Sequence, residues 1–143
     1  MDESLKRTIL LDHYQNPRNK RTVEDKSYVS LHKASDSCID DITVFMKLDN
    51  NKVVDVCYDG KGCTICISSC SIISELIKNK TINEAINIID NYLSMINEGE
   101  FDIDLLEEAN AFDSLSKQPN RIKCGTIGVN AMLELLRGYN EKQ

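Results

Sequence analysis

Six cysteines in a chain of 143 residues are the side chains best suited to chemistry. Cys38 is followed two positions later by Asp40, and in an extended segment two side chains at this spacing point to the same side. Cys63 follows Gly60-Lys61-Gly62 and opens a helical pattern, where free backbone N–H groups and the helix dipole favour a thiolate. These positions therefore supply candidate metal ligands and a candidate nucleophile.

Another candidate ligand, Cys124, lies near the start of the last predicted helix. We expect the positive charges of Arg121 and Lys123 to favour its thiolate and so lower its pKa. Three thiolates and one carboxylate complete the four-coordination of zinc or of a cluster iron, here from Cys38, Asp40, Cys63 and Cys124. On spacing alone, a metal site and a set of ordinary buried cysteines are equally good interpretations.

Cys66 and Cys70 lie on the same stripe of the predicted helix as Cys63. Isoleucines share this stripe, and a buried free cysteine behaves as a small hydrophobic residue. We therefore interpret both as core residues. The alternative is that they serve Cys63 as an auxiliary ligand or redox partner.

Three further residues with ligand atoms are not expected to join the site. His13 and His32 are the only histidines in the sequence. An isolated histidine is more often a surface or internally hydrogen-bonded residue than a metal ligand. His13 ends the first predicted helix and is a candidate for a docking surface. Cys57 points away from the predicted inward side chains of its strand and is interpreted as a spectator.

The first half of the chain predicts a helix and a small sheet. Residues 3–15 have apolar side chains near helical spacing, and Asn16-Pro17 ends the pattern. Residues 28–31 suggest an edge strand. Alternating apolar residues over 42–48 and 54–58, separated by the turn residues 49–51, predict an antiparallel hairpin that points Val54, Val56 and Tyr58 inward.

The second half of the chain predicts helices. Helical spacing runs from Cys63 to Ile77, and Thr81 with Glu84 forms a capping box for a helix that ends at Gly99. Two short helical stretches follow near residues 105 and 115, and a last helix runs from Pro119 to Gly138. The predicted class is α+β, with an antiparallel sheet of about three strands against four to six helices in a single domain, 1–143.

Composition narrows the function classes. Lys and Arg number 17 against 23 Asp and Glu, a formal net charge of −6, and the only dense basic run is 16–21, so we expect no nucleic-acid partner. No window approaches the roughly 20 apolar residues of a membrane span, and the N-terminus lacks the apolar core of a signal peptide. We expect a cytoplasmic protein without a membrane partner, whose cysteines serve metal or thiol chemistry rather than disulfides.

Four motifs together give the chain a recognisable resemblance. DHYQNPRN spans residues 12–19, GKGCTI spans 60–65 and RIKC spans 121–124, and the Cys38-Ile39-Asp40 pair lies between the first two. In this order they resemble the U-type iron–sulfur cluster assembly proteins, which comprise IscU, SufU and the N-terminal domain of NifU. The resemblance implies that a metal or nascent cluster is held by Cys38, Asp40, Cys63 and Cys124.

Within that family, the chain is most similar to the SufU branch, because Lys123 stands where IscU-like members have histidine and a long helical insertion separates Cys63 from Cys124. This implies bound zinc, or alternatively iron or a transient 2Fe-2S cluster. It also implies a pyridoxal-phosphate cysteine desulfurase of the SufS type as sulfur donor, with recipient assembly or apo iron–sulfur proteins. Cys124 would accept the persulfide sulfur, and Arg121 would steady the bound group. For Lys123, a site role and an ordinary solvated side chain are equally good interpretations.

Two positions depart from the family pattern. Ile39 replaces a glycine between the first cysteine and the aspartate, and Asp36 replaces a proline. If that glycine needed positive φ, isoleucine would be costly there. Three functions remain open: a persulfide acceptor that acts as a zinc-dependent sulfurtransferase, a cluster scaffold without that role, and a non-catalytic structural zinc domain.

Overall fold

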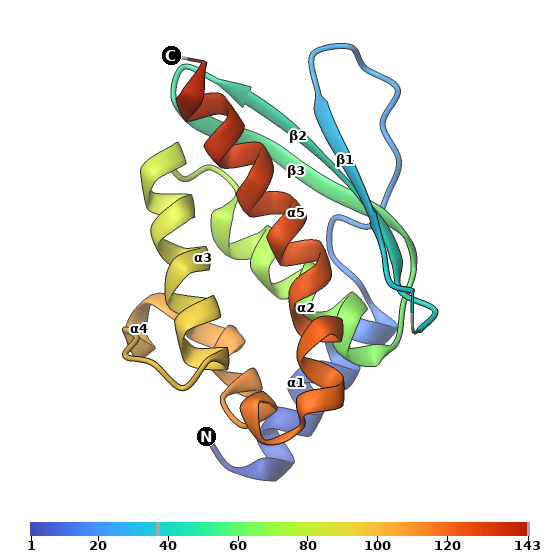
Figure 1. The fold of residues 1–143 in the computed structure, drawn as a ribbon, viewed down its shortest axis with the longest axis vertical. Helices are drawn as coiled ribbons and strands as arrows, with labels where there is room; N and C mark the ends of the chain where they lie inside the picture. The colour runs from blue at the N-terminus through green and yellow to red at the C-terminus, as the bar shows by residue number, and fades with distance from the viewer. Residues whose placement is uncertain (37, 143) are drawn as a thin grey trace.

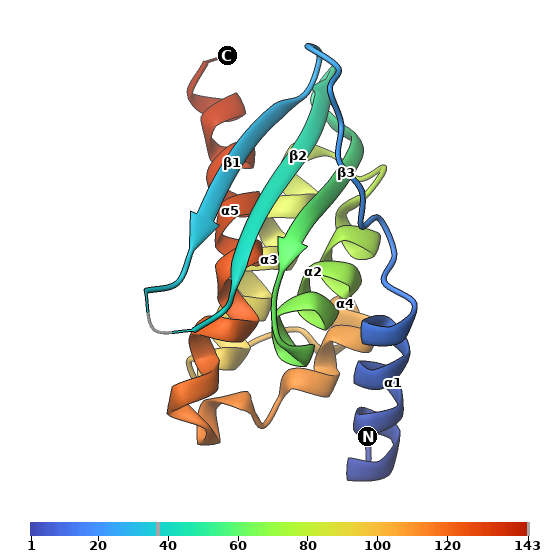
Figure 2. The same ribbon diagram turned by 90° about the vertical axis from the view of Figure 1, so that its right-hand side faces the viewer.

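The computed structural model describes residues 1–36 and 38–142. A three-stranded antiparallel sheet in the order β1-β2-β3 carries its helices on one face, with α5 across β1 and β2 and α2 against β3 (Figures 1 and 2). The predicted α+β class, with a helix first, is confirmed. The elements are α1 (Glu3–Gln15), β1 (Val29–Ala34), β2 (Asp41–Asp49), β3 (Lys52–Lys61), α2 (Thr64–Ile77), α3 (Ile82–Ile96), α4 (Ile103–Leu106), the 3-10 turns η1 (Glu107–Phe112), η2 (Leu115–Lys117) and η3 (Pro119–Arg121), and α5 (Ile122–Glu141).

The β2–β3 hairpin follows the predicted alternation on its first strand. Ile42, Val44 and Met46 are fully buried against the helices. Asn50 and Asn51 have φ values of 50° and 62°, the left-handed backbone of a two-residue hairpin turn, which asparagine adopts readily. The turn chemistry predicted from the sequence is therefore confirmed.

The second strand contains a β-bulge that the alternation does not predict. Val54 is 43% exposed, whereas its neighbour Val53 is fully buried. Lys47 pairs with Asp55. Leu48 pairs with Val53, so Val54 is left over. The prediction that Val54 points inward is wrong, because the extra residue reverses which side chain faces the core.

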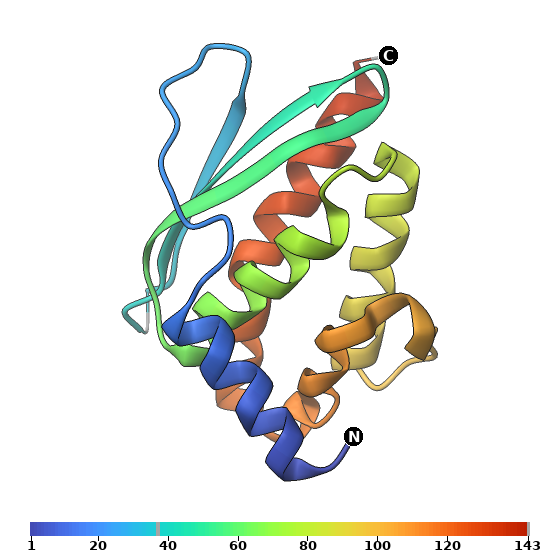
Figure 3. The same ribbon diagram turned by 180° about the vertical axis from the view of Figure 1, so that it is seen from behind.

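Helix α2 is the centre of the fold. It packs against α1, α3, α5 and β3 (Figure 3), and its serines at 68, 69, 71 and 74 are all fully buried. The hydroxyls of Ser68, Ser69 and Ser74 donate to carbonyls of their own helix at 2.6–2.9 Å, so they are buried with partners. A Cβ on Gly128 of α5 would lie 2.2 Å from the Cys70 sulfur, which shows how closely α5 approaches α2. Cys66 and Cys70 are core residues, as predicted.

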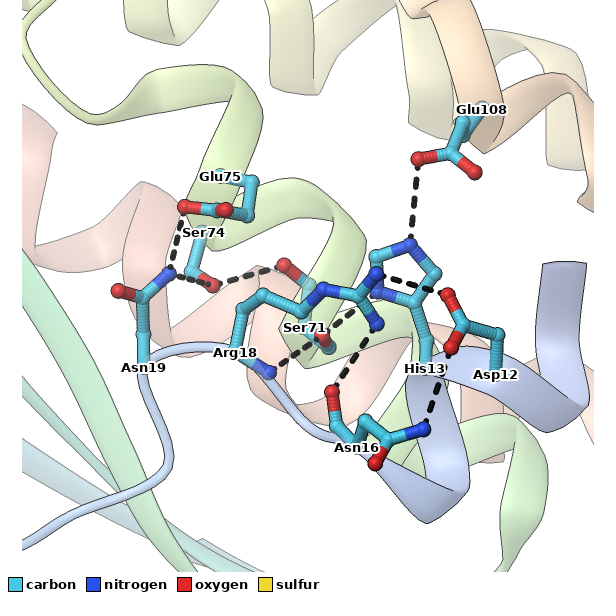
Figure 4. Close-up of polar contacts among 9 residues, drawn as sticks. All are labelled: Asp12, His13, Asn16, Arg18, Asn19, Ser71, Ser74, Glu75 and Glu108. Atoms are coloured by element: carbon cyan, nitrogen blue, oxygen red, sulfur yellow. Dashed lines mark hydrogen bonds and ion pairs between the residues drawn. The ribbon is translucent and has the colours of Figure 1, made fainter.

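The DHYQNPRN motif forms a buried polar joint between α1 and α2 (Figure 4). His13 is 2% exposed, and its Nδ1 lies 2.7 Å from the Ser71 hydroxyl and its Nε2 3.2 Å from the Glu108 carboxylate. The Arg18 backbone N–H donates to the same hydroxyl at 2.9 Å. The prediction that places His13 on a docking surface is wrong, because the imidazole is enclosed by these partners.

The remainder of the motif holds the chain that leaves α1. Arg18 forms an ion pair with Asp12 at 2.7 Å, and Asn19, whose φ is 64°, donates to the Ser74 hydroxyl at 2.9 Å. The backbone around Lys20 then pairs with Tyr58 along the outer edge of β3. The motif therefore serves to position the first helix and the sheet edge.

The predicted capping residues of α3 are confirmed, whereas several predicted helix boundaries differ from the observed ones. Thr81 and Glu84 form the complete capping box. However, α3 ends at Ile96 rather than at Gly99, Pro119 begins the 3-10 turn η3 rather than α5 itself, and α5 continues through Gly138 to Glu141. In the described part of the chain, no helix is long and apolar enough to cross a membrane.

We predict that Ser71→Ala lowers the free energy of unfolding by about 1–3 kcal/mol, because both the His13 ring and the Arg18 N–H lose a buried partner. Urea unfolding followed by circular dichroism measures the loss. Ser116→Ala, at a half-buried serine with no side-chain hydrogen bond among those the structure gives, is the control and should change stability little. Equal stability of wild type and Ser71→Ala would show that the joint does not hold the two helices.

The Asp55 carboxyl makes the stability of the fold depend on pH in the acid range. Burial raises the pKa of Asp55, but hydrogen bonds from Tyr28 at 2.5 Å and Arg21 at 2.6 Å outweigh this and lower the pKa to about 2. A carboxyl with a lowered folded pKa stabilises the fold above its unfolded pKa of about 3.9 and loses that contribution as pH falls through about 2. The stability difference between wild type and Asp55→Asn should therefore shrink from about pH 4 toward pH 2 in denaturant titrations. A difference independent of pH would contradict this assignment.

Candidate metal centre

Two segments that are distant in sequence meet at one end of the molecule. The β1–β2 loop supplies Cys38 and Asp40, and the first turn of α5 supplies Cys124 (Figure 2). The two sulfurs and one Asp40 carboxylate oxygen lie within 4.8 Å of one another. Two soft sulfurs and one oxygen at this separation are suited to zinc or iron.

Asp40 is the most informative member of the set. It is 1% exposed, and its Oδ1 accepts a hydrogen bond from the Cys63 backbone N–H at 3.0 Å. Its Oδ2 is also buried and has no hydrogen-bond partner among the described residues. A buried carboxylate oxygen without a partner is costly unless a cation compensates it. The residues present therefore fit a metal ion.

Cys63 lies beside this set rather than within it. It is the N-cap residue of α2 and is half-buried, and its side chain contributes to the raised pKa of Cys124. Among the described residues, the set enclosed within 4.8 Å does not include its sulfur. The assignment of Cys63 as the fourth ligand consequently stays a prediction.

The acidity of Cys124 differs from what its neighbours in sequence predict. Burial, together with the neighbouring Cys63 and Asp40 side chains, raises the pKa of the Cys124 thiol to about 12. The prediction that Arg121 and Lys123 lower this pKa is wrong here. Both side chains are exposed, where water screens their charge, while the thiol itself is buried. Thiolate formation at Cys124 therefore requires a nearby cation more than it requires these two residues.

A hollow of about 360 Å³ leads from solvent to the ligands. Cys38 is the exposed ligand on its wall, and Cys124 lies deeper with 3% exposure. Arg121 and Lys123, predicted to act at the site, line the same hollow together with Pro119 and Asn120. The last two were not predicted as site residues, although Pro119 was identified as the start of the helical segment that carries Cys124. The mouth of the hollow is consequently electropositive and open.

Neither departure from the family pattern strains the backbone at its own position. Ile39 is 69% exposed and is not among the described residues with positive φ. Isoleucine therefore meets no left-handed backbone at this position. Asp36 is also exposed. Neither side chain obstructs the convergence of Cys38 and Asp40.

The remaining residues considered as ligands lie outside the set. His13 is held in the α1–α2 joint, and His32 pairs with Asp41 at 2.7 Å on the exposed side of the sheet. Cys57 is buried on β3, where it pairs with Phe45, and it is not part of the set. Cys66 is nearer, because a Cβ on Gly62 would meet both the Cys66 sulfur at 2.7 Å and Asp40 Oδ1 at 3.4 Å. A hydrogen bond with Cys70, together with burial, raises the pKa of Cys66, so its thiol is neutral.

Comparison with known proteins decides the family. A family model described as the NifU-like N terminal domain matches residues 5–143. The chain belongs to this family. Relatives that match most of the chain include proteins named for iron–sulfur cluster assembly, and the family resemblance seen in the motifs is confirmed.

Two relatives and one solved structure illustrate this family membership. This NifU-like domain is 35% identical over 131 residues to the zinc-dependent sulfurtransferase SufU of Bacillus subtilis (strain 168), covering 91% of this chain and 88% of SufU. It is 29% identical to the scaffold protein IscU of Streptococcus pyogenes serotype M1, covering 90% and 80%. The crystal structure of a putative SUF-system scaffold from Fervidobacterium islandicum AW-1 superposes with a TM-score of 0.80 at 28% identity, covering 89% and 92%.

Metal binding should depend on the Asp40 carboxylate. We expect zinc to raise the unfolding temperature of the wild type, with a gain of about 2.7 kcal/mol when zinc is at about 100 times its Kd. Asp40→Asn should lose most of this gain, because the amide still accepts the Cys63 N–H but supplies no charge to the ion. Scanning calorimetry with and without zinc measures the effect, and Asp41→Asn, at the neighbouring exposed carboxylate, is the control. An equal gain in Asp40→Asn would exclude Asp40 as a ligand.

Proposed function

We propose that this protein binds zinc or iron on Cys38, Asp40, Cys63 and Cys124 and accepts persulfide sulfur from a cysteine desulfurase. It then passes sulfur or a nascent cluster to recipient assembly or apo iron–sulfur proteins. The observation that carries the proposal is the unpartnered Asp40 Oδ2, buried beside two thiols that line an open hollow. A bound cation both satisfies this oxygen and favours thiolates at the site.

The acceptor role is proposed for Cys124. A thiolate at this position attacks the outer sulfur of the desulfurase persulfide, so that a new S–S bond forms on Cys124 and the desulfurase cysteine leaves as a thiolate. Arg121 and Lys123 line the same hollow and attract the anionic persulfide. In this proposal they are positioning residues, and the donor is a pyridoxal-phosphate enzyme of the SufS type.

The similarity to SufU of Bacillus subtilis supports a zinc-dependent sulfurtransferase, because that relative carries this activity in its name and is matched over most of both chains. A scaffold role is the second candidate, supported by the name of the IscU relatives and by the open hollow, which leaves room beside the ligands. A purely structural zinc site is less well supported. Structural zinc sites are closed to solvent, whereas Cys38 is exposed.

We predict that Cys124→Ser abolishes the stimulation of a matched desulfurase. The serine hydroxyl is not a sulfur nucleophile, so no persulfide forms at the position. Sulfide production from cysteine, measured under anaerobic conditions in the presence of a reductant, reports the effect, and Cys57→Ser is the control because that thiol is buried on β3 and is not part of the ligand set. Stimulation by Cys124→Ser equal to wild type would refute the acceptor role.

A further inference from the structure

Gly60 and Gly62 lie at the junction of β3 and α2, next to the candidate metal centre. The sheet accounts for Gly60. Its φ is 135°, which residues with a side chain rarely adopt, and a Cβ there would lie 1.9 Å from the Asp41 carbonyl oxygen. Gly62 differs, because its φ is not positive and its backbone would accept other residue types. The glycine at position 62 therefore has another cause.

The space beside Gly62 is occupied by two side chains that belong to other parts of the site. A Cβ built on Gly62 would lie 2.7 Å from the Cys66 sulfur, 2.9 Å from the Cys66 Cβ and 3.4 Å from Asp40 Oδ1. Real Cβ atoms essentially never approach another atom within 3.0 Å, so any side chain at this position forces a movement.

Cys66 is poorly placed to give way. It has no exposed surface and is the third residue of α2, in the tightly packed interior. Rotation of its side chain would displace the sulfur but not the Cβ, which is itself too close. The movement therefore falls on the backbone at position 62 and on the Asp40 carboxylate.

These two groups are the two ends of one hydrogen bond. The Cys63 N–H that donates to Asp40 Oδ1 at 3.0 Å belongs to the peptide group that joins Gly62 to Cys63. The accepting oxygen is the same one that lies 3.4 Å from a Cβ at position 62. This bond holds Asp40 with its second oxygen buried and unpartnered. A side chain at position 62 would therefore disturb the contact that orients the carboxylate.

We propose that Gly62 is a positioning residue of the metal centre, because the absence of a side chain there fixes the Asp40 carboxylate and so sets the affinity for zinc. The proposal rests on metal binding in the function proposed above. Groups that orient a metal ligand typically change metal affinity by about 10–100-fold when they are altered. The atoms that crowd position 62 are side-chain atoms, so Gly62→Ala should keep the fold.

Zinc affinity of the full chain, measured by competition with a chromophoric chelator, tests the proposal. Gly62→Ala should bind zinc about 10–100-fold more weakly than the wild type. Gly138→Ala is the matched control, because a Cβ there meets no atom within 4 Å and alanine favours the helix α5. Its affinity should equal that of the wild type. Equal affinity of Gly62→Ala and the wild type would overturn the proposal.

Two double variants separate positioning from a general weakening of the fold. Cys66→Gly removes both atoms that crowd position 62, so Gly62→Ala/Cys66→Gly should regain most of the lost affinity, with Cys66→Gly alone as its reference. In an Asp40→Asn background, Gly62→Ala should cause little further loss, because the carboxylate through which it acts is already absent. No recovery in the first variant, or a full additional loss in the second, would show that Gly62 does not act as proposed.

Hydrogen exchange of the Cys63 amide, followed by NMR in the metal-free protein, keeps this outcome apart from failure of the proposed function. The amide should exchange about tenfold faster in Gly62→Ala, as expected for the loss of one hydrogen bond, while the amides of α3 keep their wild-type rates. A wild type that binds no zinc would contradict the proposed function. Faster exchange would then still support the placement of Asp40 by Gly62, and unchanged exchange would overturn it.

Discussion

The hydrogen bond from the Cys63 N–H to Asp40 Oδ1, 3.0 Å long, is the interaction on which the candidate site depends. It joins the loop between two strands to the first residue of the central helix, using an N–H that no residue within the helix could satisfy. By accepting this bond, Asp40 is held with its second oxygen buried and unpartnered toward the thiols. This hydrogen bond therefore satisfies the first N–H of α2 and fixes the β1–β2 loop. It also leaves one buried carboxylate oxygen that a bound cation would compensate.

The fold makes this contact possible by enclosing α2 on all sides. A helix surrounded by the sheet and three other helices can present its N-terminus at a defined place, and its small serine and cysteine side chains allow close approach of its neighbours. The polar joint around His13 then fixes α1 and the segment that follows it against the same helix. The DHYQNPRN motif, which resembles a family signature in the sequence, therefore has a structural role: it holds α1 against the helix whose N-terminus contributes to the site.

The site combines a buried inner part with an exposed outer part. Cys38 is exposed at the hollow, Cys124 is buried at its wall, and Cys66 is buried near Asp40. This arrangement is consistent with the proposed acceptor role, in which the site takes a reactive sulfur species from a partner. In that proposal the basic residues attract an anion at the entrance, whereas desolvation is the main cause of the raised pKa of the buried Cys124 thiol.

Local sequence patterns predict most of the elements and the candidate ligands, because helix caps, turn residues and apolar periodicity act over a few neighbouring residues. They predicted the capping box of α3, the asparagine turn and the α+β order, and they identified Cys38, Asp40 and Cys124 before their proximity was known. Tertiary structure alone decided that His13 is enclosed, that Val54 is a bulge residue and that Cys63 flanks the ligand set. It also decided that burial raises the pKa of Cys124 despite its basic neighbours in sequence. These properties depend on which distant segments exclude water from one another, and no local pattern records that.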